Sequence, residues 1–324
     1  MSKVSVIIPA FNEEDKIVEC LQSLVDQNFT DFKAYIIDDA STDSTREKIL
    51  EFQNKFPEKI SLKEYGKVGP GRARNLVANE SQSEFLVFMD ADCIATNSWL
   101  RELIIGFKDS DVGSTGGPHL APPQSSKFQL LVERFFQRAA ELKIVGIDFY
   151  KSKNFEIIEV NHNPLCNVAY RRDLFLQVGG FHEDLFPGED VELDFKVKEA
   201  GFKITYNPKA LVYHHRPESI RQFRNVMHAY GRAQGKLVRD RGIKRKIQIV
   251  GLSVFIGFSV LFFVGNFYFG IFGSMFAIYL ALAFFFIRPN GETNLGLWLN
   301  SLQWFNGFFE GFVTRRSDPP GKKK

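Results

Sequence analysis

Four acidic residues, Asp90, Asp92, Glu189 and Asp190, have the types and spacing best suited to chemistry in this sequence. Asp90 and Asp92 follow the apolar run 85–89, so we expect them at the carboxyl end of a buried strand, where open α/β sheets bind ligands. A metal ion and a diphosphate could meet at that edge. Glu189 and Asp190 follow a Pro-Gly turn and enter a helical pattern, a position that suits a carboxylate acting as a base.

The elements that position these acids are predicted from the hydrophobic pattern of the first 215 residues. Buried strands are predicted over 4–8, 34–37, 60–64 and 84–89, with helices over 13–27, 45–56 and from 72 onward. Strands that alternate with helices at this spacing predict an α/β domain with a mostly parallel sheet. A looser segment from 113 to 163 contains an aromatic helix over 128–144. It is followed by a helix over 189–201 and a late strand over 202–213.

Composition narrows the class of protein. The chain has 324 residues, 44% hydrophobic and 24% charged, which suits one large domain with an appendage. A net charge of +3, with no basic stripe among aromatics in the first 210 residues, argues against a nucleic-acid partner. Cys20, Cys93 and Cys166 lie far apart without a CxxC spacing. They predict buried structural thiols, and neither a disulfide framework nor a zinc site.

The segment 247–287 holds no charged residue. A membrane crossing takes about 20 helical residues, so this segment predicts a transmembrane helical hairpin, with a single buried hairpin of the core as the alternative. Basic residues on both sides predict a multi-pass protein of the cell membrane with its catalytic domain on the cytoplasmic side. We therefore expect a catalytic domain over 1–222, a basic juxtamembrane helix over 223–246, the hairpin over 247–287, and an interfacial helix with a basic tail over 288–324.

The stretch 295–313 is rich in Leu, Trp and Phe but also carries polar residues at roughly helical spacing. These are Asn300, Gln303, Asn306 and Glu310. Such a stripe favours an amphipathic interfacial helix in contact with membrane lipids over a third crossing. A third crossing would also send the basic tail to the far side.

Five motifs in order carry a resemblance to a known family: VSVIIPAFNE from Val4, DDASTDST from Asp38, GRARN from Gly71, DAD from Asp90 and GEDVEL from Gly188. Together they resemble the family 2 glycosyltransferases, which have the Rossmann-like GT-A fold that binds a nucleotide sugar. The likeness covers roughly the first 215 residues, and each motif alone would be weak. It implies an inverting transfer from a nucleotide-sugar donor, assisted by Mg²⁺ or Mn²⁺.

The resemblance also implies roles for the residues near the diphosphate. The last Asp of the DAD motif contacts the metal in the family, which assigns Asp92 as principal ligand and Asp90 as its neighbour or a ribose contact. Asp39 is assigned to the nucleobase. The nucleotide pocket is lined by Pro9, Ala10, Phe11 and Glu13. Arg72 and Arg74 suit phosphate oxygens or the sugar, and a surface salt bridge is equally open for one of them.

Asp190 is the candidate general base, because a neutral acceptor hydroxyl must lose its proton as it attacks the anomeric carbon. Its alternative role is that of an acidic residue favoured at a helix N-terminus. Glu189 orients Asp190 or contacts donor or acceptor. His214 and His215 end a predicted strand, and either imidazole could complete the metal site.

The sequence therefore predicts an inverting glycosyltransferase that moves a sugar to a hydroxyl of a lipid-linked or glycan acceptor. Two alternatives stay open: transfer to a polyprenyl phosphate, and nucleotide-sugar binding without catalysis. A phosphate acceptor is already anionic and needs no base, so Glu189 and Asp190 favour a hydroxyl.

Overall fold

The computed structural model describes part of the chain in continuous stretches: residues 2–141, 155–243 and 300–314, with 248–249, 252–253, 256–257, 259–268, 270, 275 and 297. The chain divides into two units, which we describe separately. The first unit contains residues 1–133 and 147–216, and the second contains 134–146 and 217–324. Helix α5 (Lys127–Glu141) begins in the first unit and ends in the second.

An eight-stranded sheet with the order β3-β2-β1-β4-β9-β6-β10-β8 forms the centre of the first unit. Its strands are β1 (Val4–Ala10), β2 (Phe32–Asp38), β3 (Ile60–Glu64), β4 (Phe85–Phe88), β6 (Val112–Gly116), β8 (Ile158–Glu159), β9 (Val168–Arg171) and β10 (Lys203–Tyr206). Only β9 and β8 run against the rest. The expected α/β architecture with a mostly parallel sheet is confirmed. Because β9 is reversed, its amino end lies at the same edge as the carboxyl end of β4.

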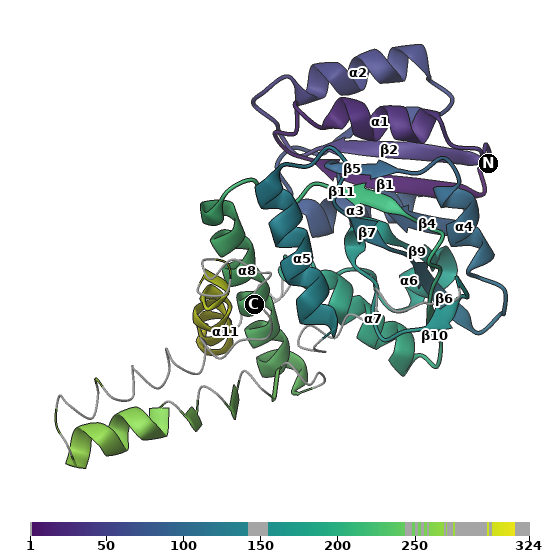
Figure 1. The fold of residues 1–324 in the computed structure, drawn as a ribbon. Helices are drawn as coiled ribbons and strands as arrows, with labels where there is room; N and C mark the ends of the chain where they lie inside the picture. The colour runs from purple at the N-terminus through teal and green to yellow at the C-terminus, as the bar shows by residue number, and fades with distance from the viewer. Residues whose placement is uncertain are drawn as a thin grey trace, which may run out of the picture. The chain divides into compact units, whose positions relative to one another are not determined.

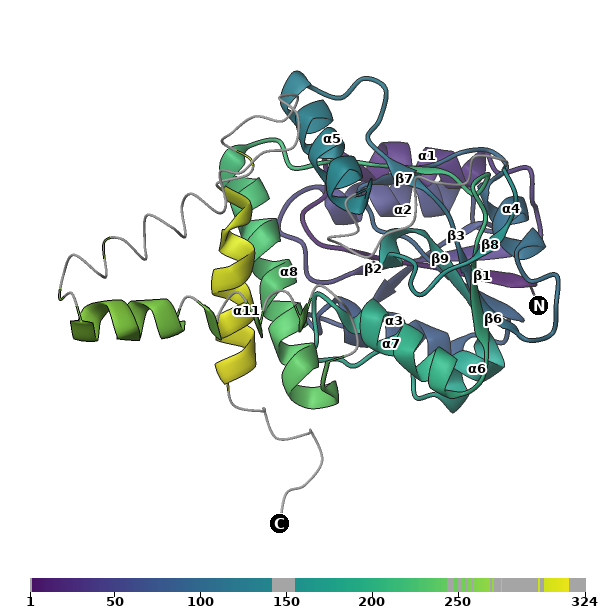
Figure 2. The same ribbon diagram turned by 60° about the horizontal axis from the view of Figure 1, so that its bottom comes forward.

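Helices cover both faces of this sheet (Figures 1 and 2). They are α1 (Ile17–Val25), α2 (Thr45–Lys55), α3 (Pro70–Glu80), α4 (Trp99–Ile105), α6 (Arg172–Gln177) and α7 (Glu189–Glu199). Along β1, Val6 and Ile8 enter the core with α1, α2 and α4, whereas Ile7 enters the core with α3, α6 and α7. The period of two along a strand thus divides one apolar run between two cores.

A second sheet has three strands in the order β5-β11-β7. They are β5 (Cys93–Ala95), β11 (Val212–His214) and β7 (His119–Leu120). The single strand predicted over 202–213 is therefore two strands, β10 and β11, in different sheets. Pro208 separates them because it has no N–H to donate, and Asn207 before it donates from its side chain to the Glu102 carbonyl at 2.8 Å.

Two helices of the second unit, α8 (Ile220–Arg241) and α11 (Gln303–Val313), lie side by side (Figures 1 and 2). The hydroxyl of Ser219 caps α8 by accepting from the Gln222 N–H at 3.3 Å. Glycines spaced by four residues bring the two backbones together. A Cβ built on Gly235 would lie 2.0 Å from the Phe308 carbonyl oxygen, and one on Gly311 would lie 2.0 Å from the Arg232 carbonyl oxygen. These glycines therefore set how closely α8 and α11 approach.

The transmembrane hairpin predicted over 247–287 is wrong. Within the described residues, no helix has both the length and the apolar character that a bilayer crossing demands. Helix α8 has 22 residues but carries several charges, and the longest described helical run in the predicted hairpin is 259–268. The same finding contradicts the predicted multi-pass location in the cell membrane. Other residues of 247–287 and most of 288–324 lie outside the described ranges, and the role of α11 as an interfacial helix stays a prediction.

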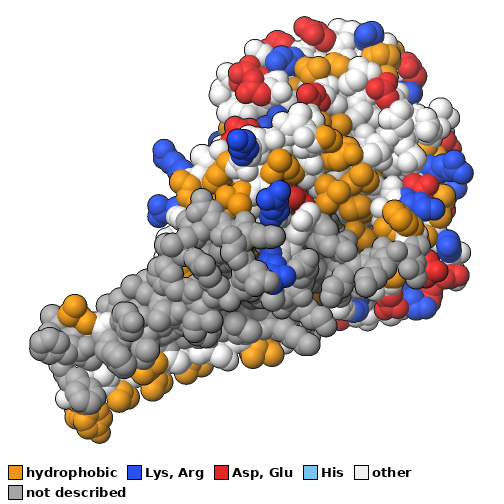
Figure 3. All heavy atoms as spheres, viewed as in Figure 1, with side chains coloured by type: hydrophobic (Ala, Val, Ile, Leu, Met, Phe, Trp, Pro, Cys, Tyr) orange, Lys and Arg blue, Asp and Glu red, His pale blue; other side chains and the backbone are white. Residues whose placement is uncertain are grey.

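The described residues of 256–268 expose apolar side chains, with Phe263 at 71% and Phe267 at 83% exposure. Figure 3 shows apolar side chains along this segment. A run of exposed large side chains is uncommon on the surface of a single chain. The apolar character that the sequence predicts for 247–287 is therefore visible in the described residues 256–268 as exposed large side chains.

Candidate active site

The two acidic motifs meet through one buried arginine. Arg74, on α3, donates from Nη2 to Asp90 Oδ1 at 2.7 Å and from Nη1 to Glu189 Oε1 at 3.1 Å. Arg74 and Glu189 are each only 2% exposed. The guanidinium fork of Arg74 thus holds the end of β4 against the start of α7. Arg72, in contrast, is exposed and its Nε lies 4.0 Å from Glu183 Oε2.

A cluster of possible metal ligands lies beside this bridge. Each of three residues offers one ligand atom, and these atoms lie within 4.8 Å of one another: Asp90, Asp92 and His214. The Nε2 atom of His214 is 3.4 Å from Asp92 Oδ1. Carboxylate and imidazole donors suit Mn²⁺, and the carboxylates suit Mg²⁺. This donor set fits the divalent ion that the family resemblance implies.

The electrostatics of the cluster differ between its two acids. Burial raises the pKa of Asp90, with a further contribution from Asp92 and against the opposing charge of Arg74. Burial also acts to raise the pKa of Asp92, but His214, together with the charges of Lys16 and His215, outweighs it and brings this pKa below its ordinary value. Asp92 is therefore the more readily ionised of the two, as a metal ligand must be.

The two adjacent histidines have different surroundings. Whereas His214 faces Asp92, the Nε2 of His215 lies 3.7 Å from Glu19 Oε2. The backbone N–H of His215 donates to the Asp92 carbonyl at 3.3 Å. The geometry therefore favours His214 as a third ligand. The sequence alone does not distinguish the two.

Asp190 lies in the first turn of α7, with both carboxylate oxygens held by backbone donors. Oδ1 accepts from the Val191 N–H at 2.8 Å, and Oδ2 accepts from the Leu165 N–H at 3.2 Å. Asp190 is also close enough to Asp90 for its charge to help raise the pKa of Asp90. The candidate base thus has a fixed orientation near the cluster.

The prediction from sequence did not include His162, which lies between two acids of α7. Its Nδ1 is 2.8 Å from Asp194 Oδ2, and its Nε2 is 3.8 Å from Asp190 Oδ2. Asp194 is fully buried and also accepts from the Tyr170 hydroxyl at 2.8 Å. The spacing of Asp190 and Asp194 by four residues along a helix was the signal for a shared partner, but nothing in the sequence pointed to His162.

The residues predicted for the nucleotide lie at the ends of β1 and β2. Pro9 and Ala10 pair with the end of β2, and the Asp39 N–H donates to the Ala10 carbonyl at 2.9 Å. The Asp39 carboxylate accepts from the Val68 N–H at 2.7 Å and from the Gly69 N–H at 3.0 Å. It therefore closes the loop that leads into α3.

Phe11 and Glu13 follow β1 at the same edge. The Phe11 side chain is 44% exposed, and the Lys67 ammonium lies 5.0 Å from its ring centroid. Burial, reinforced by the charge of Asp92, raises the pKa of Glu13 from 4.5 to about 7. Glu13 is thus electrostatically coupled to the acid cluster, while Phe11 offers an exposed aromatic face.

Comparison with known proteins agrees with this fold. Residues 5–179 match the family described as Glycosyl transferase family 2. The chain belongs to this family, and the prediction made from its five motifs is confirmed.

Two relatives and one solved structure show the extent of the likeness. The poly(ribitol-phosphate) beta-N-acetylglucosaminyltransferase TarS of Staphylococcus aureus is 38% identical over 104 residues, which are 32% of this chain and only 18% of TarS. The glycosyltransferase AglE of Haloferax volcanii is 26% identical over 262 residues, 79% of this chain and 81% of AglE. The mannosyltransferase PcManGT from Pyrobaculum calidifontis, in complex with GDP-Man and Mn²⁺, shares the fold at a TM-score of 0.62 with 17% identity, over 96% of this chain and 87% of that one. The predicted GT-A fold is confirmed.

Proposed function

We propose that this protein transfers a sugar, with inversion, from a nucleotide-sugar donor to a hydroxyl of a glycan or glycolipid acceptor. The observation that carries the proposal is the Arg74 bridge, which joins the Asp90–Asp92 cluster to the turn that holds Asp190. An acid site for the donor and a candidate base for the acceptor are thereby held at one edge of the sheet. Such a division between two acidic groups suits a displacement in which one bond forms as another breaks.

Asp92 and His214, with Asp90 as neighbour, would hold Mg²⁺ or Mn²⁺. When bound, such an ion neutralises charge that develops on a nucleoside diphosphate as it leaves. Two findings support this role: the close approach of ligand atoms from Asp90, Asp92 and His214, and the Mn²⁺ in the complex of PcManGT, whose fold is similar. The buried Nε of Arg74 has no hydrogen-bond partner among the described residues and offers a further donor toward an oxygen of the donor substrate.

Asp190 would take the proton of the acceptor hydroxyl. A base must keep its lone pairs aimed at the reacting oxygen, and the N–H groups of Leu165 and Val191 hold the carboxylate in one orientation. His162 lies between this carboxylate and Asp194, with Nε2 3.8 Å from Asp190 Oδ2 and Nδ1 2.8 Å from Asp194 Oδ2. We assign His162 as a positioning residue. A hydroxyl acceptor agrees with the name of TarS, a poly(ribitol-phosphate) beta-N-acetylglucosaminyltransferase.

The test is turnover of labelled nucleotide sugars with Mg²⁺ or Mn²⁺, followed by transfer to hydroxyl acceptors. A general base contributes about 10²–10⁴-fold, so Asp190→Asn should lower transfer by that factor and leave metal-dependent donor binding intact. Glu199→Gln, an exposed acid at the other end of α7, is the matched control and should transfer normally.

Three outcomes would redirect the proposal. Full activity of Asp190→Asn on a hydroxyl acceptor would remove the base assignment. Transfer to a polyprenyl phosphate that does not depend on Asp190 would favour the phosphate alternative. Binding of the donor without metal-dependent release of nucleoside diphosphate would identify a non-catalytic binding protein.

A further inference from the structure

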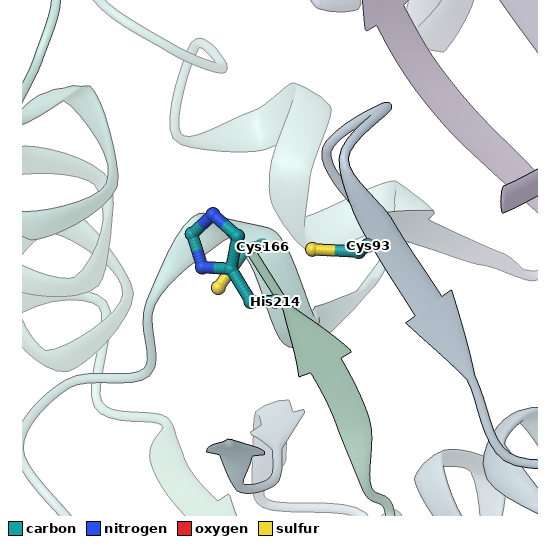
Figure 4. Close-up of side chains that lie close together, drawn as sticks. All are labelled: Cys93, Cys166 and His214. Carbon is teal, nitrogen blue, oxygen red and sulfur yellow. The ribbon is translucent and has the colours of Figure 1, made fainter. Parts of the chain in front are cut away.

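Two buried thiols and an imidazole come together next to the acid cluster, from three distant segments of the chain (Figure 4). Cys93 begins β5, Cys166 lies in a 3₁₀ turn (Leu165–Asn167) just before β9, and His214 ends β11. Their two sulfurs and a ring nitrogen all lie within 4.8 Å of one another. Both cysteines are free, with exposures of 0% and 5%. This group is referred to below as the thiol cluster.

The donor set of the thiol cluster is that of a zinc site. Two thiolates with one imidazole form three ligands of a tetrahedral Zn²⁺ site that leaves a fourth position open. With Zn–S lengths of about 2.3 Å, two sulfurs in such a site are about 3.8 Å apart. The atoms of the thiol cluster, at 4.8 Å or less, would need to move by an ångström or less. Mg²⁺ prefers oxygen ligands and would not compete for the sulfurs.

The surrounding structure fixes all three donors in place. Cys93 and His214 lie directly opposite each other in the antiparallel pair of β5 and β11. Residues so placed have Cβ atoms about 4.5–5.5 Å apart. The position of Cys166 is fixed by its neighbour Asn167, whose side-chain amide donates to the carbonyls of Pro118 and Ala210 at 2.8 and 2.7 Å. Asn167 also accepts from the Trp99 indole at 2.7 Å.

His214 has two ring nitrogens with different surroundings. Nε2 faces the Asp92 carboxylate at 3.4 Å. Nδ1 is buried and has no hydrogen-bond partner of ordinary geometry among the described residues. A buried ring nitrogen without such a partner is costly, and Figure 4 shows the ring beside the Cys166 sulfur. A metal ion bound to Nδ1 would satisfy it.

We propose that Cys93, Cys166 and Nδ1 of His214 form a second metal site, selective for a thiophilic ion of the zinc class. Binding releases the proton of each thiol to solvent and forms a metal–sulfur bond in its place. An imidazole that binds the ion through Nδ1 keeps its proton on Nε2, and it then donates a hydrogen bond to Asp92. The thiol cluster would thereby convert His214 from a ligand of the acid cluster into a donor to it, a consequence that rests on the function proposed above.

Cobalt is the probe, because a thiolate bound to Co²⁺ gives a sulfur-to-metal charge-transfer absorption that oxygen and nitrogen ligands do not give. Reduced, metal-free full-length protein titrated with Co²⁺ should show this band together with the visible bands of tetrahedral cobalt. An equivalent of Zn²⁺ should remove both. Absence of the charge-transfer band would overturn the proposal.

Variants assign the band to its ligands. Cys93→Ser and Cys166→Ser should each weaken or abolish it, whereas Cys20→Ser, a control at another buried free cysteine, should keep it. Asp92→Asn should also keep it, which separates the thiol cluster from the acid cluster and from the proposed activity. Equal loss of the band in Cys20→Ser would show that the ligands were assigned wrongly.

A measurement on the wild-type protein guards against variants that fail to fold. X-ray absorption of the zinc-loaded chain should show sulfur neighbours at about 2.3 Å from the metal. A first shell of nitrogen and oxygen alone would place the zinc at the acid cluster and refute the second site.

Discussion

Removal of the Arg74 guanidinium is the sharpest test of how the two acidic motifs are held together. Arg74→Met keeps much of the apolar stem but leaves Asp90 and Glu189 without the donors that lie at 2.7 and 3.1 Å. Breaking a buried ion pair by removing one partner costs about 3–5 kcal/mol, because a charge is left buried and unpaired. For a domain of this size, we expect the melting temperature to fall by about 6 °C or more.

The pH dependence of this loss follows from Glu189. Burial, with Arg74 opposing it and Asp190 adding to it, raises the pKa of Glu189 from 4.5 to about 7. Without Arg74 this pKa rises further. A carboxyl whose pKa is raised on folding lowers stability as the pH rises from its unfolded pKa to its folded pKa, and in Arg74→Met this interval extends above about pH 7. The destabilisation by Arg74→Met should therefore be larger at about pH 8 than at about pH 6.

Urea and thermal unfolding of four proteins complete the test: wild type, Arg74→Met, Glu189→Gln and the double variant. We expect the double variant to be more stable than the sum of the single losses predicts, since the unpaired charge of Glu189 is then absent and only Asp90 is left without its donor. Arg72→Met, an exposed arginine on the same helix, should change stability by no more than about 0.5 kcal/mol. Additive losses, or an equal loss in Arg72→Met, would refute the bridge as the element that joins the motifs.

Three further predictions concern the acid cluster and the helix pair. In metal-free protein, the contribution of Glu13 to stability should fall as the pH rises from 4.5 to about 7, because unfolded Glu13 ionises before folded Glu13 does. Thermal melts of Glu13→Gln should lack this contribution, about 1–2 kcal/mol after solvent screening. Mn²⁺ at about 100 times its dissociation constant should stabilise the wild type by about 2.7 kcal/mol in a thermal melt, and Asp92→Asn should lose this shift. Gly235→Ala should destabilise the packing of α8 on α11 by about 1–3 kcal/mol and speed hydrogen exchange in α11, whereas Gly257→Ala, whose added Cβ has no described residue within 4 Å, should not.

Each of these has a clear contrary result. A Glu13→Gln variant with the same pH profile as the wild type would mean that Glu13 ionises normally in the folded chain. An undiminished Mn²⁺ shift in Asp92→Asn would place the metal elsewhere. Identical exchange rates in the two glycine variants would mean that α8 and α11 do not meet at Gly235.

The sequence predicted what depends on local pattern. The runs that became β1 and β4 enter the cores on both faces of the sheet, and those that became β2 and β3 have apolar residues at alternate positions, so their ends, and therefore Asp39, Asp90 and Asp92, could be placed at one edge. It did not predict the Arg74 bridge, because the contact joins residues 115 positions apart. It also did not predict the reversed strand β9. The positions of His162 and Cys166 depend on that reversal.

The membrane prediction rested on composition, which reports how apolar a segment is. It does not report whether that segment forms one continuous helix. The segment 247–287 has no charged residue and is apolar. The described residues nevertheless contain no helix that is long and apolar enough to cross a membrane. The single strand predicted over 202–213 was wrong for a similar reason, because Pro208 interrupts a segment that hydropathy alone presents as one strand.

The reversed direction of β9 has a consequence for how this family member can diversify. In a fully parallel sheet, only the segments that follow the strands border the edge where ligands bind. Here a strand enters the sheet from that edge, so the chain that precedes it, with His162, Leu165 and Cys166, also borders the site. Changes in the approach to β9 can therefore alter the groups around the acids without disturbing the strand ends that hold Asp90 and Asp92. One inverted strand thus supplies a separate place where new specificity can arise.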